Sequence, residues 1–321
     1  MTPLLICPGC RKRDGALHLQ TLEPAGGDVL ACACGRRYPI IDGVPLVLAD
    51  PSHYLRTELG AVVERDLPLD VAALLVEHGS DDAPYARMLE HLSIYLDAHW
   101  GDRADPSDGF AASALVDRLA MRPEVEAAVE LGCSAGRITA ELARKAEHVM
   151  AIDLQFATLR RARRLLAGEP LPYNRRMVGR HYAPVTARAA DLATDRVRFI
   201  CSDALDPPLV PAHYDRVVAL NLLDSVREPA TLLAVLDGLC APGGEVILSS
   251  PYTWQSGIVD DDARLGGPDP APATIAWFAN RGYTLQDQDD LPWPLRRDAR
   301  SSASYRTHYV RVRKPGSGGT V

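Results

Sequence analysis

The chain has 321 residues, of which 47% are hydrophobic, which is enough for one large domain and a smaller one. Its formal net charge of −7 argues against a protein that coats nucleic acid through a generally basic surface. No apolar run reaches the roughly 18 residues of a membrane helix, and cysteines follow the first residues too closely for a signal peptide. We therefore expect a cytoplasmic protein without a membrane partner.

The first fifty residues contain four of the seven cysteines, arranged as two close pairs. Cys7 and Cys10 flank a Pro-Gly dipeptide, and Cys32 and Cys34 follow after a gap of twenty-one residues. Two close thiolate pairs across a hairpin-length gap can surround a zinc ion tetrahedrally, whereas disulfides are disfavoured in a reducing compartment. We predict a structural Zn²⁺ site at these four cysteines, with disulfides or free thiols as the alternative.

The segment that follows, Tyr38-Pro-Ile-Ile-Asp-Gly-Val-Pro-Leu-Val-Leu48, resembles the end of small zinc-ribbon domains of the Trm112 type. The resemblance implies a ribbon over residues 1–50 that serves as an interaction or lid module and offers a surface to a protein partner. So small a domain buries little core, so we expect the metal to hold it folded. Over residues 51–118, apolar residues at three- and four-residue spacing predict a helical linker or lid on the mouth of a sheet. The helices predicted there span residues 55–63, 71–78 and 85–99.

Residues 125–153 have the pattern of a strand, a glycine turn, a helix and a second strand that ends on an acid. The strands are predicted over 125–131 and 148–152, and the helix over 135–146. In a doubly wound sheet, such a unit binds a nucleoside at the carboxyl ends of the strands. The turn reads Gly132-x-x-x-Gly136 rather than G-x-G-x-x-G, so the dinucleotide fingerprint is absent.

The polar groups around this turn match one nucleoside in particular. Asp153 can accept hydrogen bonds from both ribose hydroxyls, Glu130 can accept from an ammonium group, and the helix N-terminus favours a carboxylate. A ribose diol, an ammonium and a carboxylate together describe S-adenosylmethionine. The motif and its spacing resemble the class I methyltransferases, and the resemblance continues to the C-terminus. It implies an α/β, Rossmann-like sheet of seven strands over residues 119–314. The abundance of proline and glycine predicts a disordered tail at 315–321.

The remaining elements alternate as that fold requires. Strands are predicted over 197–201, 214–220, 245–249, 282–286 and 305–312, and helices over 156–166, 228–239 and 275–280. In the methyltransferase sheet the last strand is inserted antiparallel. Asp203, after the third strand, can accept the adenine amino group, and the backbone amide of Ala204 can donate to the ring. Asn221 follows the fourth strand, beside the methyl group to be transferred, although polar residues at strand ends often only cap the next helix.

The cofactor-binding residues expected on this basis come from four strand ends and the glycine turn. They are Glu130, Gly132, Cys133, Ser134, Gly136, Asp153, Leu154, Ser202, Asp203, Ala204, Asn221 and Leu222.

Four segments resemble a narrower family. Tyr95-Leu-Asp-Ala-His-Trp-Gly101, Asn221-Leu-Leu-Asp-Ser225, Ser249-Ser-Pro-Tyr-Thr-Trp254 and Arg296-Arg-Asp-Ala-Arg300 are similar to the methyltransferase domain of ovothiol biosynthesis, which methylates an imidazole nitrogen of a sulfur-bearing histidine. They are more distantly similar to carnosine N-methyltransferases. The resemblance covers about residues 85–313 and implies a small imidazole- or amino-acid-type acceptor. The segment after Trp254 lacks the family's glutamates, tryptophan and lysine, and a ribbon stands in place of its iron-dependent sulfoxide synthase domain.

The acceptor residues expected from these segments orient a nucleophile for in-line transfer, because a neutral imidazole needs no strong base. Asn221, Asp224 and Tyr252 are the candidate catalytic residues. Aromatic contact is expected from Trp254, and a cover over the pocket from Tyr95 and His99, which lie four residues apart. A carboxylate fork is expected from Arg296 and Arg300. The alternatives are a structural loop for Tyr252 and Trp254, core packing for Tyr95 and His99, and a solvated charge run for the two arginines.

Two other functions remain open from the sequence. Residues 155–198 contain ten arginines and no lysine, which would suit a methyltransferase of RNA, or of protein, that presents its substrate through the ribbon. The arginines at 160–164 also alternate with an apolar stripe, as on an ordinary solvated helix face. The third hypothesis is a binding module that has kept the fold and lost catalysis.

Overall fold

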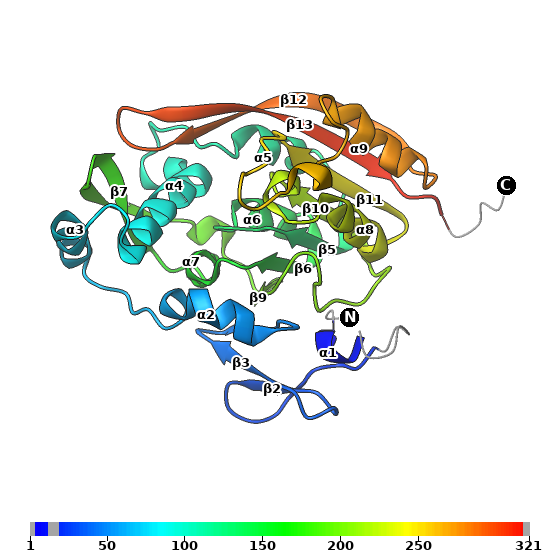
Figure 1. The fold of residues 1–321 in the computed structure, drawn as a ribbon, viewed down its shortest axis with the longest axis horizontal. Helices are drawn as coiled ribbons and strands as arrows, with labels where there is room; N and C mark the ends of the chain where they lie inside the picture. Colours follow the sequence, from blue (N-terminus) through cyan, green and yellow to red (C-terminus); the bar gives the residue numbers. More distant parts are fainter. Residues whose placement is uncertain (1–3, 12–18, 317–321) are drawn as a thin grey trace.

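The computed structural model describes residues 4–11 and 19–316. A small N-terminal ribbon lies at one edge of a central sheet, helices flank the sheet, and a long hairpin of β12 and β13 crosses the opposite side (Figure 1). Within the described ranges, no helix combines the length and the apolar character needed to cross a bilayer. Residues 317–321 of the predicted tail lie outside the described part of the chain.

The central sheet has seven strands in the order β12-β13-β11-β10-β5-β6-β9. The strands β9, β6, β5, β10 and β11 run parallel, and β13 is inserted antiparallel between β11 and β12. This topology confirms the predicted α/β, Rossmann-like sheet and its antiparallel last strand. The strands are β5 (Val125–Leu131), β6 (Ala146–Asp153), β9 (Val197–Cys201), β10 (Tyr214–Leu220), β11 (Cys240–Ser250), β12 (Thr284–Arg296) and β13 (Ser302–Arg313).

Both faces of the sheet are covered, so the central strands are almost continuously apolar. Neighbouring residues of one strand point to opposite faces. Val217 packs in the core beneath α8 (Pro229–Leu239) and α9 (Pro270–Ala279), whereas Val218 packs with α5 (Ser113–Ala120) and α6 (Arg137–Ala143). The helix α7 (Phe156–Leu166) covers the sheet near β6 and β9.

The predicted helical segment contains α2 (Pro51–Val62), α3 (Leu69–His78) and α4 (Pro84–Ala104). The Asp50 side chain caps α2 by accepting hydrogen bonds from the Ser52 and His53 amides. The longest of the three is α4, which buries one face against the sheet and packs on β7 and β12. This placement brings α4 over the glycine turn that follows β5.

Two hairpins differ from the sequence prediction. The hairpin of β7 (Leu171–Val178) and β8 (His181–Ala187) lies in the arginine-rich segment, where no strand was predicted. Its arginines pair with acids on α4, and in β7 only the first residues, such as Leu171 and Tyr173, bury apolar side chains, so the apolar alternation that usually marks a strand is short. The hairpin of β12 and β13 is longer than the strands predicted over 282–286 and 305–312. The sequence prediction missed its outer half because acids and prolines there interrupt the pattern of a strand.

The ribbon begins with the one-turn helix α1 (Pro8–Arg11) and continues with four short antiparallel strands in sequence order. These strands are β1 (Glu23–Pro24), β2 (Val29–Ala31), β3 (Arg37–Ile41) and β4 (Val44–Pro45). Gly43 adopts a positive φ of 72° in the tight turn between β3 and β4, where a side chain would collide with Arg163 of α7. The positive φ accounts for the glycine, whereas the guanidinium end of the flexible Arg163 side chain could move aside.

Candidate functional site

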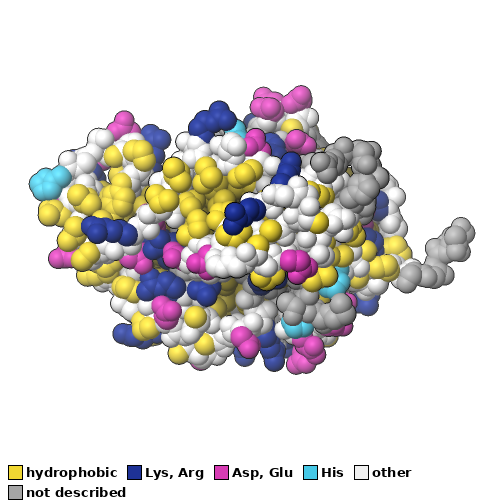
Figure 2. Space-filling model, turned by 90° about the horizontal axis from the view of Figure 1, so that it is seen from below, with side chains coloured by type: hydrophobic (Ala, Val, Ile, Leu, Met, Phe, Trp, Pro, Cys, Tyr) yellow, Lys and Arg dark blue, Asp and Glu magenta, His cyan; other side chains and the backbone are white. Residues whose placement is uncertain are grey.

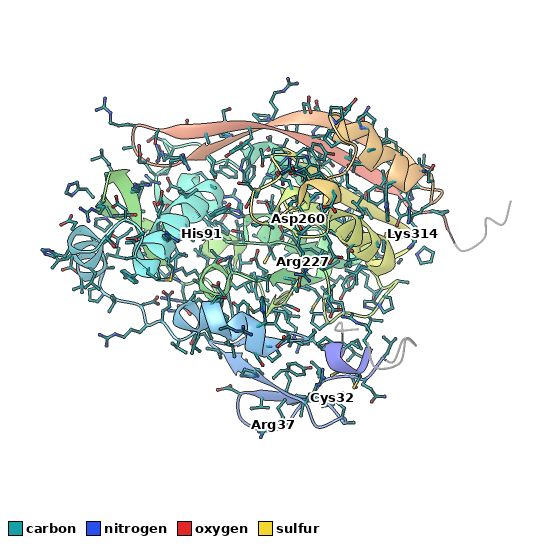
Figure 3. All side chains as sticks on the ribbon, viewed as in Figure 1. Cys32, Arg37, His91, Arg227, Asp260 and Lys314 are labelled. Atoms are coloured by element: carbon teal, nitrogen blue, oxygen red, sulfur yellow. The ribbon has the colours of Figure 1, made fainter. Side chains whose placement is uncertain are left out.

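A cavity of about 510 Å³ opens at the carboxyl ends of β5, β6, β9 and β10. Parallel strands bring these ends to one edge of the sheet, as the register pairs Leu131 with Ile152 and Asp153 with Cys201. Helix α4, the β12–β13 hairpin and the loop that follows β11 supply most of the remaining walls. Figure 3 shows His91 on α4 and Arg227 near the middle of the molecule, both of which line the cavity, and Cys32 in the separate ribbon.

Asp153 lies at the tip of β6 and shapes the glycine turn opposite it. Its two carboxylate oxygens accept hydrogen bonds from the backbone amides of Ser134, at 2.7 Å, and Gln155, at 2.8 Å. Each oxygen keeps a second lone pair. Burial raises the pKa of Asp153, and the backbone amides oppose this rise. The turn requires Gly132 at a φ of 77°, and a Cβ atom there would come within 2.9 Å of the Leu222 side chain.

Glu130 lies directly before this turn and is 2% exposed. It accepts a hydrogen bond from the Thr139 hydroxyl of α6. Burial raises the pKa of Glu130 to about 8, which the Asp153 charge reinforces and the Thr139 hydrogen bond opposes. The carboxyl group is therefore protonated at neutral pH unless a cation enters the cavity beside it.

Ser202, Asp203 and Ala204 follow β9 and line the cavity beside Leu154 and Leu222. One Asp203 oxygen accepts from the Leu205 amide at 2.8 Å, and the other pairs with Arg227 at 3.1 Å. The structure therefore brings together most of the predicted cofactor-binding residues around one space.

Cys133 and Gly136 are the exceptions among those predicted residues, because neither is part of the cavity lining. The Cys133 side chain is fully buried, and burial raises its pKa. Gly136 has a φ of 81°, and a Cβ atom there would lie 2.9 Å from Ala162 of α7. Close packing between the turn and α7 accounts for this glycine.

Helix α4 closes over the turn through two side chains. The Trp100 indole donates to the carbonyl oxygen of Ala135 at 2.6 Å, and His99 Nδ1 accepts from the Arg137 amide at 3.2 Å. His99 thus occupies the amide at the start of α6 that the sequence assigned to a ligand carboxylate. Burial, with the nearby Arg137 charge, lowers the pKa of His99 to about 3, so its ring is neutral.

Tyr95 and His91 continue the same face of α4 at intervals of four residues and also line the cavity. Their rings stack at a centroid distance of 4.4 Å. Burial lowers the pKa of His91 to about 4. Burial, with the charges of Asp153 and Asp224 among its neighbours, raises the pKa of Tyr95. This wall of the cavity is therefore aromatic and uncharged.

Asn221 lies at the end of β10 with a positive φ of 54°. Its Oδ1 accepts from the hydroxyls of Ser249, at 3.0 Å, and Thr307, which fixes the amide so that Nδ2 is the end left to donate. Nδ2 is buried and has no hydrogen-bond partner within the described residues. Strain and an unmatched donor at one residue are features of functional sites.

Asp224 follows in the short 3-10 turn of Leu223–Ser225 and is 1% exposed. Its Oδ2 accepts from the Thr253 amide at 2.9 Å and the Thr253 hydroxyl at 2.6 Å. Its Oδ1 is buried without a hydrogen-bond partner in the described ranges. Asn221 and Asp224 both line the cavity, and each has one buried polar atom, a donor in Asn221 and an acceptor in Asp224, without a hydrogen-bond partner among the described residues.

Tyr252 and Trp254 lie beside the cavity but not among its lining residues. The Tyr252 hydroxyl contacts His308 Nδ1 at 2.9 Å and donates to the Thr274 hydroxyl at 3.2 Å. The Tyr252 and Trp254 rings lie 5.8 Å apart. Both residues support the loop that carries Thr253, and the aromatic wall comes from elsewhere.

Arg296 and Arg300 are also absent from this cavity and line a separate one of about 680 Å³. Arg296 pairs with Asp108 at 3.1 Å and with Asp97 of α4 at 3.2 Å. Arg300 is exposed in the turn of the β12–β13 hairpin. The predicted carboxylate fork is therefore not assembled at the cavity in this structure.

The sequence interpretation missed the contribution of the β12–β13 hairpin. Trp293 and Leu295 of β12 and Tyr305 of β13 line the cavity, and Trp293 and Tyr305 are cross-strand partners. The Trp293 ring also meets His99 edge-on at 6.5 Å. A Trp-Pro dipeptide in an acidic segment gave no sign of this role, because the register with β13 creates it.

The four predicted cysteine ligands form one cluster in the ribbon, with all sulfur atoms within 4.8 Å of one another. Cys7 Sγ lies 3.9 Å from Cys34 Sγ, and Cys10 Sγ lies 3.6 Å from Cys32 Sγ. A tetrahedron with Zn–S bonds of about 2.3 Å has sulfur atoms about 3.8 Å apart, whereas a disulfide would need about 2.05 Å. The cysteines are free thiols whose arrangement fits a tetrahedral metal ion.

The ribbon docks on the segment that carries the predicted adenine-binding residues. Leu46 forms a parallel bridge with Cys201, the Val47 amide donates to the Cys201 carbonyl at 2.9 Å, and the Ser202 hydroxyl donates to the Val47 carbonyl at 2.6 Å. At the other end of the segment, the Ile6 amide donates to the Pro208 carbonyl at 2.8 Å. The Arg11 guanidinium adds a bond of 2.6 Å to the Pro207 carbonyl. The ribbon thus holds residues 201–208 from both ends.

Comparison with known proteins agrees with this geometry. Residues 129–248 match the family model of the methyltransferase domain, a range that begins within β5, ends within β11 and contains all the predicted cofactor-binding residues. Together with the sheet order, the match identifies the α/β, Rossmann-like methyltransferase fold.

Individual relatives are distant. An uncharacterized methyltransferase of Mycobacterium bovis is 29% identical over 116 residues, which cover 36% of this chain and 46% of the relative. The chain thus spans about half the length of this relative. A ubiquinone biosynthesis O-methyltransferase of Xanthomonas euvesicatoria is 25% identical over 199 residues, with 57% and 73% covered. A solved complex that contains the Haloferax volcanii Trm112 methyltransferase activator superposes with a TM-score of 0.46 at 15% identity, over 78% of this chain and 100% of that chain.

Proposed function

We propose that the chain is a methyltransferase that uses S-adenosylmethionine and transfers the methyl group to a small acceptor in the cavity. The observation that carries the proposal is the convergence of Glu130, Gly132 and Asp153 on one cavity at the carboxyl ends of parallel strands. This is where open α/β sheets bind nucleosides. The match of residues 129–248 to the methyltransferase domain supports the same conclusion.

The part of the cavity lined by Glu130, Asp153, Asp203 and Ala204, here called the cofactor half, offers a partner for each polar group of that nucleoside. The free lone pairs of Asp153 suit the two ribose hydroxyls, and Asp203 with the Ala204 amide suits the adenine edge. Glu130, protonated in the free protein, ionises to accept from an ammonium group. When bound, the sulfonium group supplies an activated methyl, so the protein has only to align the nucleophile and exclude water.

The part of the cavity lined by Tyr95, Asn221, Asp224 and Tyr305, here called the acceptor half, is suited to a compound with an N–H group beside a nucleophilic nitrogen. We infer that Asp224 Oδ1 accepts the N–H of an imidazole-like ring and so orients the other ring nitrogen toward the methyl group. Asn221 Nδ2 donates to a further acceptor atom on the same compound. Tyr95 and Tyr305 flank the ring, and no strong base is required, since a neutral imidazole nitrogen carries a free lone pair.

A nucleic-acid substrate is less well supported. Most of the arginines in residues 155–198 have acidic partners within the chain, for example Arg161 with Glu64 at 2.7 Å and Arg175 with Asp108 at 2.8 Å. Figure 2 shows basic and acidic side chains intermingled on the face that it presents. An RNA-binding surface would leave a row of unpaired basic groups for phosphates.

We further propose that the ribbon binds zinc at Cys7, Cys10, Cys32 and Cys34, and that the metal holds the ribbon in its docked conformation. Four thiolates suit Zn²⁺, and a ribbon of this size depends on such a staple. The exposed face of the ribbon is the candidate surface for a protein partner, as the resemblance to Trm112-type ribbons implies.

Calorimetry with S-adenosylmethionine and S-adenosylhomocysteine tests the proposed function. Asp153→Ala removes the acceptor of two ribose hydroxyls, each such charge-assisted bond being worth about 1.5–3 kcal/mol. We therefore expect the dissociation constants of both nucleosides to rise by about 100-fold or more in this variant. With the parent protein, a methyl-transfer screen over imidazoles should detect turnover. Asp262→Ala, on an exposed acid outside the cavity, is the control. Failure of the parent protein to bind either nucleoside would refute the proposal, and so would unchanged affinity in a folded Asp153→Ala variant.

A further inference from the structure

The acceptor half of the cavity offers no free cationic side chain among the described residues. Arg296 and Arg300, the expected partners of an acceptor carboxylate, line a different cavity, and Arg296 is already held by Asp97 and Asp108. Arg227 lines the cavity at its exposed rim, with 61% of its side chain exposed, and it pairs with Asp203. An acceptor carboxylate would therefore have no unpaired cation to meet.

Asp224 gives the same region an uncompensated negative charge. Its partners are the amide and hydroxyl of Thr253, and within the described part of the chain no basic side chain lies at ion-pair distance from it. A carboxylate that is 1% exposed and lacks a cationic partner is costly. A cationic ligand repays this cost, whereas a second carboxylate would add repulsion.

The walls around Asp224 also favour a cation. Tyr95, Trp293 and Tyr305 line the cavity, and aromatic faces attract ammonium and guanidinium groups through their quadrupoles. His91 and His99 add two rings that are uncharged at neutral pH, because burial favours their neutral forms. The arrangement therefore joins one buried anion to several aromatic rings.

We propose that the natural methyl acceptor is a neutral, planar nitrogen ring that carries a separate cationic group and no carboxylate near the reacting nitrogen, and that Asp224 selects it by charge. The inference rests on the proposed function and narrows its substrate class. It disfavours a free amino acid, which carries a carboxylate, and favours an imidazole or similar ring that bears an aliphatic ammonium group.

Three imidazoles that differ only in the charge of their side chain test this proposal. Histamine is a cation at neutral pH, histidine a zwitterion and imidazole-4-acetate an anion. Each is titrated into the full-length protein saturated with S-adenosylhomocysteine, and its dissociation constant is measured by calorimetry. We expect histamine to bind about tenfold or more tightly than histidine, and imidazole-4-acetate to bind most weakly, because of its charge beside a buried carboxylate.

Asp224→Asn identifies the source of the preference. The asparagine Oδ1 can still accept from Thr253, so the loop is retained while the charge is lost. We expect the spread between the three imidazoles, meaning the largest ratio between their dissociation constants, to shrink to about threefold or less. The affinity for S-adenosylhomocysteine should stay unchanged, which checks that the variant is folded. Asp260→Asn, an exposed acid of the following loop labelled in Figure 3, is the matched control and should leave the full spread.

The outcomes separate the two proposals. Equal or tighter binding of histidine or imidazole-4-acetate would overturn the charge selection, and so would the absence of binding by all three or an unchanged spread in Asp224→Asn. In each of these cases S-adenosylhomocysteine still binds, and the proposed function stands. Loss of S-adenosylhomocysteine binding in the parent protein would instead refute the methyltransferase proposal and this inference with it.

Discussion

If the ribbon binds zinc and the cavity binds the cofactor as proposed, removing the metal should weaken cofactor binding at a site that contains no metal-ligating cysteine. The segment 201–208 receives the bonds already described from Val47, Ile6 and Arg11, and it donates one from Ser202 to the ribbon. These four hydrogen bonds are worth about 1 kcal/mol net each, and Arg11 adds further bonds to the carbonyl and the carboxylate of Asp206. The four counted bonds alone restrain the predicted adenine-binding segment by about 4 kcal/mol.

Cys10→Ser removes one of the four thiolates and should release the metal. If the ribbon then unfolds, the segment 201–208 loses this restraint, and the cofactor must order it on binding. We expect the dissociation constant of S-adenosylhomocysteine to rise by about tenfold to a thousandfold, since each factor of ten corresponds to about 1.4 kcal/mol. Elemental analysis for zinc and calorimetry on the same sample measure the two effects together.

Cys240→Ser is the matched control, because Cys240 is a buried thiol of β11 outside the ribbon. It should retain both zinc and affinity. Ser202→Ala removes a single bond to the Val47 carbonyl and should weaken binding about threefold to tenfold with the metal retained. A metal-free Cys10→Ser protein with parental affinity would refute this reasoning, and so would a parent protein that contains no zinc.

Two further predictions concern ionisable groups. Because burial raises the pKa of Glu130 to about 8, the native state binds more protons than the unfolded chain between pH 4.5 and 8, and the free energy of unfolding should fall as pH rises through that range. Affinity for S-adenosylhomocysteine, whose ammonium group favours the ionised form of Glu130, should rise with pH to about 8 and then level off. The Glu130→Gln variant should show neither the stability trend nor the affinity trend over this range. An affinity that does not change with pH in the parent protein, measured by calorimetry, would contradict the assignment of Glu130 to the ammonium group. Asp108→Asn breaks the pairs with Arg296, whose side chain is 39% exposed, and with Arg175, whose side chain is 11% exposed. Because both arginines keep Asp97 as a partner, the loss should cost about 1–3 kcal/mol of stability. Hydrogen exchange in the outer half of the β12–β13 hairpin should accelerate in this variant but not in Arg306→Gln, whose side chain is 80% exposed on the same hairpin.

The central sheet and the cofactor half of the cavity could be predicted because local patterns determine them. Strand β5, its glycine turn and β6 lie within thirty residues, and parallel pairing necessarily brings Gly132 and Asp153 to one edge. The cysteine cluster was equally accessible, because two short spacings limit how four sulfur atoms can be arranged. In both cases the relevant residues lie close together in the sequence or at the ends of obvious strands.

The acceptor half depended on contacts between distant segments. Arg296 was predicted to bind a ligand carboxylate, but it bonds to Asp97, which lies 199 residues away in the sequence. Trp293 and Tyr305 become cavity walls only through the register of β12 with β13. His91 was not singled out, since a lone histidine on a helix is more often part of a core. The alternation of residue types that marks a strand does not indicate which side chains of distant segments come into contact.

The covalent link between the ribbon and the rest of the chain has a consequence for how the two stay together. Leu46 already bridges β9, and α2 begins at Pro51, so very little backbone separates the docked ribbon from the next packed helix. A module supplied by another polypeptide would dissociate on dilution, whereas here its local concentration is set by the length of the tether. Occupancy of the β9 edge by the ribbon is therefore independent of the concentration of the protein.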